Sequence, residues 1–355
     1  MRLAILNDTH AGVRGDMVEM AKYQGRFYNE IFFPYLLEND INHIIHLGDY
    51  FDRRKFINFA SLKSNRDDFI EPLIKNNITM DLIIGNHDTY YKNTNDVNAP
   101  ELLLFDKANI EVIGSPKVKE YDGCRLALVP WINNDNYADS VEFLLTADAA
   151  TCMGHFEIEG AMMNPQVMCS HGLDHTYLKR FDKVYSGHFH HKTDLKNIRY
   201  LGSQMQFTWN DYGDEKYFHI FDTETLEMTP IHNPLRMFEK AFYDDTKETF
   251  ESIRDKDYDT YTGKFVKVIV VNKDNPYWFD SFLDKVHAAS PIHLQIVDDH
   301  QHMDLMGDDE IENVEDTLTI LSKYIDGLEI QGKKKPLNEL MTSLYNEALD
   351  EHTYL

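Results

Sequence analysis

Five short polar segments, each directly after an apolar run, constrain the fold of this chain more than any other feature of its sequence. They are LNDTHAG (6–12), HLGDYFD (46–52), IIGNHD (83–88), CMGHFE (152–157) and SGHFHH (186–191). A short apolar run bounded by turn-forming residues is typical of a buried strand. Polar residues that follow several buried strands can meet at one edge of a sheet. The pattern therefore predicts an α/β fold with a polar site where its strands end.

The side chains in these segments offer more oxygen and imidazole ligands than one metal ion can hold. A carboxylate has two oxygens and can bridge two ions, and mixed nitrogen and oxygen ligands suit Mn²⁺, Fe or Zn²⁺ better than Mg²⁺ or Ca²⁺. In an extended segment Asp8 and His10 would point to the same side and reach one cation. We expect two divalent ions, Mn²⁺ first with Mg²⁺ possible, and these ligands: Asp8, His10, Asp49, Asn86, His155, His188 and His190.

Other polar residues in or near these segments have competing interpretations. His43 and His46 lie inside an apolar run and are predicted to pack in a strand. His171, in CSHG, competes with His155 for the same role as a metal ligand. We prefer His155, because the apolar run before His155, Ala150–Met153, is the better strand. Asp52 either shapes the site or caps a loop, and the sequence leaves both open.

The first 230 residues alternate strand-like runs with helical patterns, which predicts an α/β fold. One helix is expected to carry Phe27, Ile31 and Tyr35 on one face, with Asp16 as its N-cap, and a second helix should span about 59–75. The runs 216–221 and 226–231 predict a closing hairpin. The other expected strands are Leu3–Leu6, His43–Leu47, Asp81–Ile84, Arg125–Val129, Ala150–Met153, Val184–Ser186 and Arg199–Leu201.

The pattern changes near residue 238, so we divide the chain into 1–235, 236–297, 298–312 and 313–355. The second part should be a small α+β domain with strands at 264–271 and 292–297 around a helix at 277–288. The third part is acidic and is predicted to be a linker. The last part has two segments with apolar residues at helical spacing, separated by a hinge at 332–336. This helical tail either docks on a partner or folds back on its own domain.

Composition restricts the function classes. The net charge of −25 makes the chain a poor nonspecific binder of nucleic acid, unless bound cations or a partner supply positive charge. Three scattered cysteines predict reduced thiols. The chain opens almost at once on a strand-like run, which leaves no room for a signal peptide, and no apolar run approaches the roughly 20 residues that span a bilayer. We expect a soluble, cytoplasmic protein without membrane contact.

The ordered segments resemble the calcineurin-like metallophosphoesterase superfamily over residues 1–232. The resemblance implies a β-sandwich flanked by helices (α/β/β/α). It also implies one metal held by Asp8, His10, Asp49 and His190, and a second held by Asp49, Asn86, His155 and His188. His87 would then be the general acid and Asp88 would orient its imidazole, while Asp52 keeps the two interpretations given above.

Two branches of this superfamily compete. Protein serine/threonine phosphatases carry GDxxDRG and GNHE, and GDYFDRR places Arg53 at their phosphate-binding arginine. However, Arg54 replaces the glycine and Asp88 the glutamate of those motifs. The SbcD-type nucleases have D-x-H, GD-x-FD, GNHD, GH and GHxH in this order, then a cap and a helical tail. Length and compactness are similar to those of the bacteriophage members of this branch.

The nuclease resemblance implies exonucleolytic and endonucleolytic DNA cleavage in recombination, end processing and repair. It implies an SbcC-type coiled-coil ATPase bound through 313–355, and the host cell cytoplasm if the chain is phage-encoded. It also implies a homodimer, which we expect near Asn58–Lys75 and Ala99–Lys107, although the apolar cluster at 102–105 could equally be core. Local cations for DNA would be Arg14, Arg53, Arg54, Lys55 and Lys92. The alternatives are a small-molecule or protein phosphoesterase of the same superfamily, or a scaffold with a degenerate site.

Overall fold

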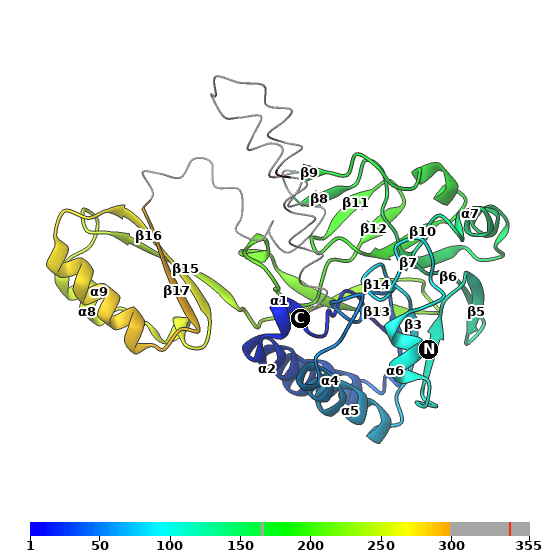
Figure 1. Ribbon diagram of the computed structural model, residues 1–355, viewed down its shortest axis with the longest axis horizontal. Coiled ribbons are helices and arrows are strands. Elements are labelled where there is room, and N and C mark those ends of the chain that lie inside the picture. Colours follow the sequence, from blue (N-terminus) through cyan, green and yellow to red (C-terminus); the bar gives the residue numbers. More distant parts are fainter. Residues whose placement is uncertain (165–166, 299–340, 342–355) are drawn as a thin grey trace.

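Two six-stranded sheets form the body of the protein (Figure 1). The computed structural model describes residues 1–164, 167–298 and 341. In the first sheet the order β14-β13-β1-β2-β3-β4 comprises Met228–Asn233, Lys216–Asp222, Arg2–Leu6, His43–His46, Thr79–Ile83 and Ile110–Ile113. In the second the order β11-β12-β10-β7-β6-β5 comprises Thr193–Leu195, Ile198–Tyr200, Lys183–Gly187, Thr151–His155, Cys124–Val129 and Lys117–Tyr121.

Alternate side chains of each strand enter different apolar layers, as the period of a strand requires. Leu3 and Ile5 of β1 pack between the sheets against Met153 and Tyr185 of the second sheet. Ala4 and Leu6 point the other way, into a layer beneath the helices. The second sheet likewise buries alternate residues in a third layer on its outer side. The predicted α/β sandwich flanked by helices is confirmed.

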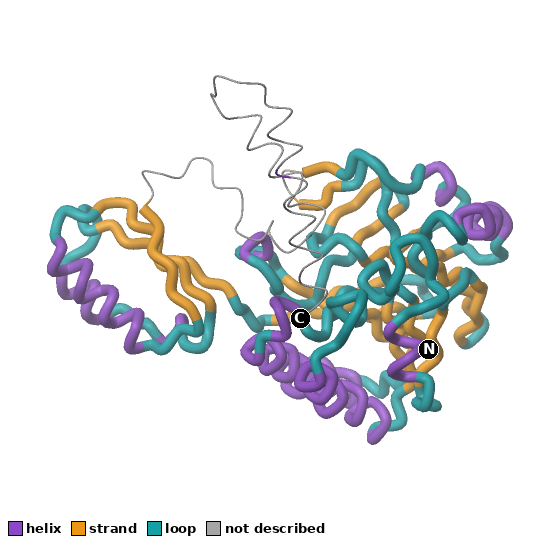
Figure 2. The backbone as a smooth tube through the Cα atoms, in the orientation of Figure 1, coloured by secondary structure: helices purple, strands orange, loops and turns teal. Residues whose placement is uncertain are grey.

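Two long helices cover the outer face of the first sheet (Figure 2). The first runs through α2 (Val18–Arg26), a π-helical segment η1 (Phe27–Phe32) and α3 (Phe33–Glu38); the second runs through α4 (Phe59–Asn65), η2 (Arg66–Ile70) and α5 (Glu71–Lys75). The predicted span of 59–75 is confirmed. The N-cap prediction was wrong: Met17 precedes α2, and Asp16 closes the short α1 (Val13–Asp16). The Asp16 carboxylate instead accepts from Arg53 Nη1 at 2.9 Å and Ser61 Oγ at 2.7 Å.

Every strand expected from an apolar run is present, although several bounds differ by one or two residues. The sequence missed β4 and β5, which are the edge strands of their sheets. β4 is a four-residue strand interrupted by Glu111, and three of the five residues of β5 are charged, so the apolar signal is weak in both. The helix α6 (Ala99–Leu104) lies within the range 99–107 that was expected after the third motif. The sequence also missed several shorter elements: α7 (Tyr137–Thr146), β8 (Met162–Asn164), β9 (Val167–Met168), β11, η3 (His175–Leu178) and η4 (Trp209–Asp211).

A three-stranded parallel sheet follows the body and lies to one side of it (Figure 1). It comprises β15 (Phe238–Asp244), β16 (Phe265–Asn272) and β17 (His293–Asp298), linked by α8 (Phe250–Asp255), η5 (Asp259–Tyr261) and α9 (Pro276–Ala288). The expected strand–helix–strand unit is present, but β15 was missed. This part has its own apolar core, including Tyr243, Val268 and Phe282.

The division of the chain into four parts stays a prediction. Except for residues 298 and 341, the expected linker and helical tail lie outside the described residues. Within the described part of the chain, no helix is both long enough and apolar enough to cross a membrane.

Candidate metal centre

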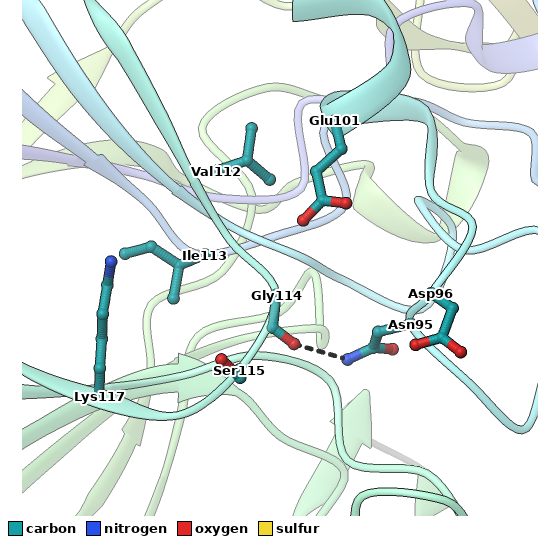
Figure 3. A pocket seen from close by; sticks show the side chains of 8 residues that line it. All are labelled: Asn95, Asp96, Glu101, Val112, Ile113, Gly114, Ser115 and Lys117. Atoms are coloured by element: carbon teal, nitrogen blue, oxygen red, sulfur yellow. Dashed lines mark hydrogen bonds between the residues drawn. The ribbon is translucent and has the colours of Figure 1, made fainter. Parts of the chain in front are cut away.

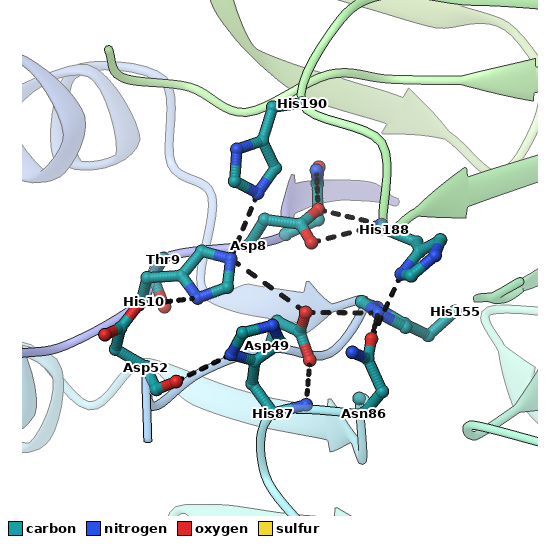
Figure 4. Close-up of polar contacts among 12 residues, drawn as sticks. Asp8, Thr9, His10, Asp49, Asp52, Asn86, His87, His155, His188 and His190 are labelled. Carbon is teal, nitrogen blue, oxygen red and sulfur yellow. Dashed lines mark hydrogen bonds and ion pairs between the residues drawn. The ribbon is translucent and has the colours of Figure 1, made fainter. Parts of the chain in front are cut away.

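The five polar segments converge at the carboxyl ends of β1, β2, β3, β7 and β10 (Figure 4). The first three strands are parallel neighbours in one sheet, and β7 and β10 are parallel neighbours in the other. Main-chain hydrogen bonds join the segments beyond the strands, as Asp8 N donates to Gly48 O at 2.9 Å and His10 N to Asp49 O at 3.1 Å. The topology therefore assembles side chains that are far apart in sequence, such as His10 and His190, which are 180 residues apart.

Four of the predicted ligands have left-handed backbone conformations. The φ angles are 48° at Asp8, 46° at His10, 53° at Asp49 and 88° at His188. A non-glycine residue held there costs about 1–2 kcal/mol, and such residues cluster at functional sites. The expectation that an extended segment aims Asp8 and His10 was wrong. β1 ends at Leu6, and two left-handed residues turn these side chains into the site.

Glycines beside the ligands allow the segments to approach one another. A Cβ on Gly48 would lie 2.6 Å from His155 Nδ1, and one on Gly85 would lie 2.2 Å from both the main-chain nitrogen and Oδ1 of Asp49. A Cβ on Gly187 would lie 2.9 Å from Asp8 Oδ2. The glycines of the GD, GN and GH pairs are thus required by close packing at the site.

The first predicted ligand set meets at one point. Asp8, His10 and His190 each place a donor atom within 4.8 Å of the others. His10 Nε2 and His190 Nε2 are 3.1 Å apart, and Asp8 is held by Asn7 Nδ2 at 2.6 Å. The facing imidazole nitrogens point their donor positions at a shared space, as ligands of one cation would.

The second set meets next to the first, with Asp49 between them. Asp49, His155 and His188 also have donor atoms within 4.8 Å of one another. Asn86 Oδ1 is 2.9 Å from His155 Nε2 and 3.0 Å from His188 Nδ1. Asp49 Oδ2 lies 3.3 Å from His155 Nε2 and 3.9 Å from His10 Nε2. One carboxylate thus faces both sets, as expected for a bridging ligand.

The protonation pattern of this donor set fits bound cations. His155 Nδ1 donates to the Leu47 carbonyl at 2.7 Å, which leaves Nε2 facing the oxygens of Asn86 and Asp49. Burial alone would lower the pKa of this histidine, but the Asp49 carboxylate raises the pKa to about 9. The pKa of His10 is also about 9, because Asp52 and Asp49 outweigh burial. The buried carboxylates therefore create a field that favours positive charge, which divalent cations would supply.

His87 lies at the edge of the two ligand sets, where Asp52 holds its ring. Its Nδ1 donates to the Asp52 main-chain carbonyl at 2.6 Å, and its main-chain N donates to Asp49 Oδ1 at 2.8 Å. Burial lowers the pKa of His87. The Asp52 carboxylate lies 3.4 Å from His10 Nδ1. Asp52 therefore contacts both a predicted ligand and the predicted acid, so it shapes the site.

Asp88 does not orient His87 as the resemblance implied. Its Oδ1 accepts from the main-chain nitrogens of Tyr50 and Phe51, both at 3.0 Å, and its Oδ2 accepts from Gly85 N at 2.9 Å. The prediction was wrong because the three amides use the carboxylate to tie the loop after β2 to the loop after β3. Burial, helped by the charge of Asp49, raises the pKa of Asp88 to about 7.

Sequence reasoning missed three residues that line the centre. Glu157 Oε1 lies 3.8 Å from His188 Nε2. The Trp131 ring centroid is 5.4 Å from that of His188, and Phe207 packs edge-on against His10 at 5.7 Å. Glu157 was visible in the sequence because it follows His155 by two positions. The two aromatic residues come from loops with no polar pattern to mark them.

The rival histidines lie elsewhere. His171 is largely exposed and 3.4 Å from Glu157 Oε1, outside both predicted sets. His46 is buried against Thr9 Oγ1 at 2.9 Å, and His43 contacts Asp81 at 3.1 Å. A separate open cavity of about 510 Å³ lies beside β4 and α6, where Asn95 reaches the Gly114 carbonyl (Figure 3). It contains none of the predicted site residues.

Comparison with known proteins identifies the family. The family model for calcineurin-like phosphoesterases matches residues 1–321. The chain belongs to the calcineurin-like phosphoesterase family. It is accordingly a metal-dependent phosphoester hydrolase, and the two ligand sets are where divalent ions would bind.

One relative matches across almost the whole chain. It is "Exonuclease subunit 1" of Enterobacteria phage T4, 31% identical over 351 residues, which cover 98% of this chain and 99% of the relative. Among solved structures, an archaeal phosphodiesterase covers 66% of this chain and 100% of its own, with 13% identity and a TM-score of 0.33. A dimetal phosphatase from Danio rerio covers 66% and 97%, with 11% identity and a TM-score of 0.41. Both TM-scores are below 0.5, so these two structural similarities are weak.

Proposed function

We propose that this chain is a two-metal DNA phosphodiesterase, acting as exonuclease and endonuclease in recombination, end processing and repair. The observation that carries the proposal is the full-length similarity to a phage exonuclease subunit, combined with two ligand sets that share Asp49. Mn²⁺ is the favoured ion, with Mg²⁺ possible, because the ligands mix imidazole nitrogen with oxygen. A phage-encoded subunit of this kind would work in the host cell cytoplasm.

The contacts in the centre support the proposed residue roles. Two divalent ions at such a site activate water and stabilise the charge that develops on phosphoryl oxygens. Asp8, His10, Asp49 and His190 would hold one ion, and Asp49, Asn86, His155 and His188 the other. Asp52 positions His10 through its carboxylate and His87 through its main-chain carbonyl.

His87 is the proposed general acid. With Nδ1–H committed to the Asp52 carbonyl, its Nε2 is the nitrogen left to give a proton to the leaving oxygen or to donate to a phosphoryl oxygen. If His87 has this role, a substitution of His87 should leave metal binding intact but abolish DNA cleavage.

We further propose that an SbcC-type coiled-coil ATPase supplies most of the DNA affinity. The chain is strongly acidic, and its local cations are partly committed: Arg53 forms an ion pair with Asp16 at 2.9 Å and lies over Phe56. The nuclease alone should therefore cleave weakly and with strong salt dependence. The proposed docking segment, 313–355, lies outside the described residues, except for residue 341. Deletion of the chain after Asp309 should abolish co-purification with the ATPase and leave metal binding unchanged.

A homodimer through the surfaces near α4 and α6 is part of the same proposal. The apolar cluster at 102–105 is divided in the structure: Leu104 is buried, whereas Leu102 and Phe105 are exposed. Phe59, at the start of α4, is also exposed. Replacement of Phe59 or Phe105 by Glu should shift a dimer to monomer in sedimentation analysis. A chain that is monomeric at all concentrations would remove this part of the proposal.

The decisive experiment compares cleavage of single- and double-stranded DNA in Mn²⁺ and Mg²⁺ by the wild type and by His87→Ala. The mutant should bind metal normally but lose about 100-fold or more in cleavage rate, the range for loss of a general acid. His232→Ala is the control, because His232 is an exposed histidine of β14 that forms an ion pair with Glu215. Unchanged cleavage by His87→Ala would remove His87 from the mechanism.

The same assay separates the alternative function. A small-molecule or protein phosphoesterase would hydrolyse an aryl phosphodiester or a phosphopeptide and leave DNA intact. Cleavage of DNA by the wild type, lost in Asp49→Asn, is the result expected of a nuclease.

A further inference from the structure

A second cluster of ligand-type side chains lies beside the metal centre and has no part in the proposed mechanism. Glu157, Cys169 and His171 each place one donor atom within 4.8 Å of the others. Glu157 follows His155 by two residues, and the other two come from the CSHG segment (169–172). The nuclease proposal leaves this segment without a role.

The main chain fixes the position of these three donors. Leu173 N donates to Glu157 O at 2.8 Å, and Cys169 N donates to Ala161 O at 2.8 Å. Gly172 has a φ of 113°, and a Cβ there would lie 2.5 Å from the Glu157 carbonyl oxygen. The CSHG turn is therefore held tightly against the segment that carries Glu157, so the spacing of the donors is set by the fold.

The charges of the cluster are not balanced by a basic side chain. In the part of the chain that the structure describes, Glu157 forms ion pairs only with His171 and His188. Another group of acidic side chains shows the contrast: Asp211 and Asp214 also lie near a histidine, but Lys216 Nζ hydrogen-bonds to both carboxylates. The charge of the Asp211 group is therefore compensated without a metal ion.

Cys169 determines which metal ions the cluster of Glu157, Cys169 and His171 could bind. Its buried thiol donates to the His171 carbonyl oxygen at 2.9 Å, and burial raises the pKa of the thiol. Such a thiol stays protonated until a cation binds the sulfur and displaces the proton. Thiolate, imidazole and carboxylate together are ligands typical of Zn²⁺, with solvent as the fourth ligand beside the exposed His171 ring.

We propose that Glu157, Cys169 and His171 form a separate site for one thiophilic divalent cation of the Zn²⁺ type. Binding transfers the Cys169 thiol proton to solvent and leaves a sulfur–metal bond. The ion would also fix the Glu157 carboxylate, whose Oε1 lies 3.8 Å from His188 Nε2 in the catalytic centre. The site is distinct from the centre proposed for catalysis, whose ligands include no sulfur.

Cobalt absorption tests the proposal without any activity measurement. The metal-free full-length protein is titrated with Co²⁺, because a thiolate–cobalt bond gives an intense near-ultraviolet charge-transfer band and nitrogen or oxygen ligands do not. The wild type should show this band with one sulfur-bound cobalt per chain, and Zn²⁺ should displace it. Cys169→Ser should lose the band, whereas the matched control Cys124→Ser should keep it.

Two further variants make the outcome independent of folding and of the catalytic centre. His171→Ala removes an exposed ring and should weaken the cobalt affinity by about tenfold or more while circular dichroism stays unchanged. Asp49→Asn alters the catalytic centre and should keep the band. The proposal is overturned if the wild type shows no thiolate–cobalt band, or if the band persists in Cys169→Ser.

Discussion

The carboxylate of Asp88 should stabilise the protein by joining two loops, and this can be measured directly. Asp88 is fully buried and accepts hydrogen bonds from the main-chain nitrogens of Tyr50, Phe51 and Gly85. Asp88→Ala leaves three buried N–H groups without an acceptor. Each such group costs about 1–3 kcal/mol, so the three together should lower the free energy of unfolding by about 3 kcal/mol or more.

Asp88→Asn should fall between the wild type and the alanine variant. Its single amide oxygen can serve either the Tyr50 and Phe51 amides or the Gly85 amide, and its NH₂ group then faces the others. At roughly 1.3 °C per kcal/mol for a chain of this size, Asp88→Ala should unfold about 4 °C or more below the wild type.

Thermal unfolding of metal-free protein, followed by circular dichroism, gives the comparison. Asp148→Ala is the matched control, because Asp148 is exposed and makes one surface ion pair with Arg125, so its loss should cost less than about 1 kcal/mol. If Asp88→Ala unfolds at the wild-type temperature but loses activity, Asp88 acts on catalysis and its role in joining the two loops is refuted.

Two other substitutions, Asp81→Asn and Gly85→Ala, test interactions of β3 and of the loop that follows it. Burial alone would raise the pKa of Asp81, but hydrogen bonds from His43, Lys119 and Tyr121 lower it. Its stabilisation should therefore be complete above the unfolded pKa of about 3.9 and be lost as pH falls through the lower folded pKa. The difference in unfolding temperature between wild type and Asp81→Asn should be larger at pH 7 than at pH 3; a difference independent of pH would contradict this. Gly85→Ala would force a Cβ to 2.2 Å from the Asp49 main-chain nitrogen, and should weaken Mn²⁺ binding in calorimetry by about tenfold or more. Gly123→Ala, with open space around it, should bind Mn²⁺ normally, and equal affinities in both variants would contradict the packing argument.

The sequence indicated which polar side chains converge, because these side chains follow strongly apolar strands. Leu3–Leu6 and His43–Leu47 have an unambiguous apolar signal, and the polar residues after them therefore meet at one edge. The choice of His155 over His171 depended on the same argument, and the structure places His155 beside Asn86 and His171 outside that set. The local pattern of apolar and polar residues was thus sufficient to predict the order of the main strands and which polar side chains would converge.

Backbone angles and hydrogen-bond partners that depend on contacts between distant segments could not be predicted from the sequence. Nothing in LNDTHAG indicates that Asp8 and His10 have positive φ, since this conformation is imposed by hydrogen bonds to the loop after β2. The partners of Asp88 are main-chain amides, which leave no trace in side-chain spacing. β15 was missed because FEKAFYD lacks the period-two alternation that marks a strand: Glu239 and Lys240 are adjacent, and three apolar residues follow them.

In the proposed mechanism Asp49 joins two ligand sets into one two-metal centre. This role of Asp49 can be measured by electron paramagnetic resonance of the metal-free protein titrated with Mn²⁺. The wild type should bind two Mn²⁺ ions per chain with an exchange-coupled spectrum, and Asp49→Asn should lose the coupled signal. A wild type that binds one isolated Mn²⁺ ion, or an Asp49→Asn variant that keeps the coupled pair, would contradict the account.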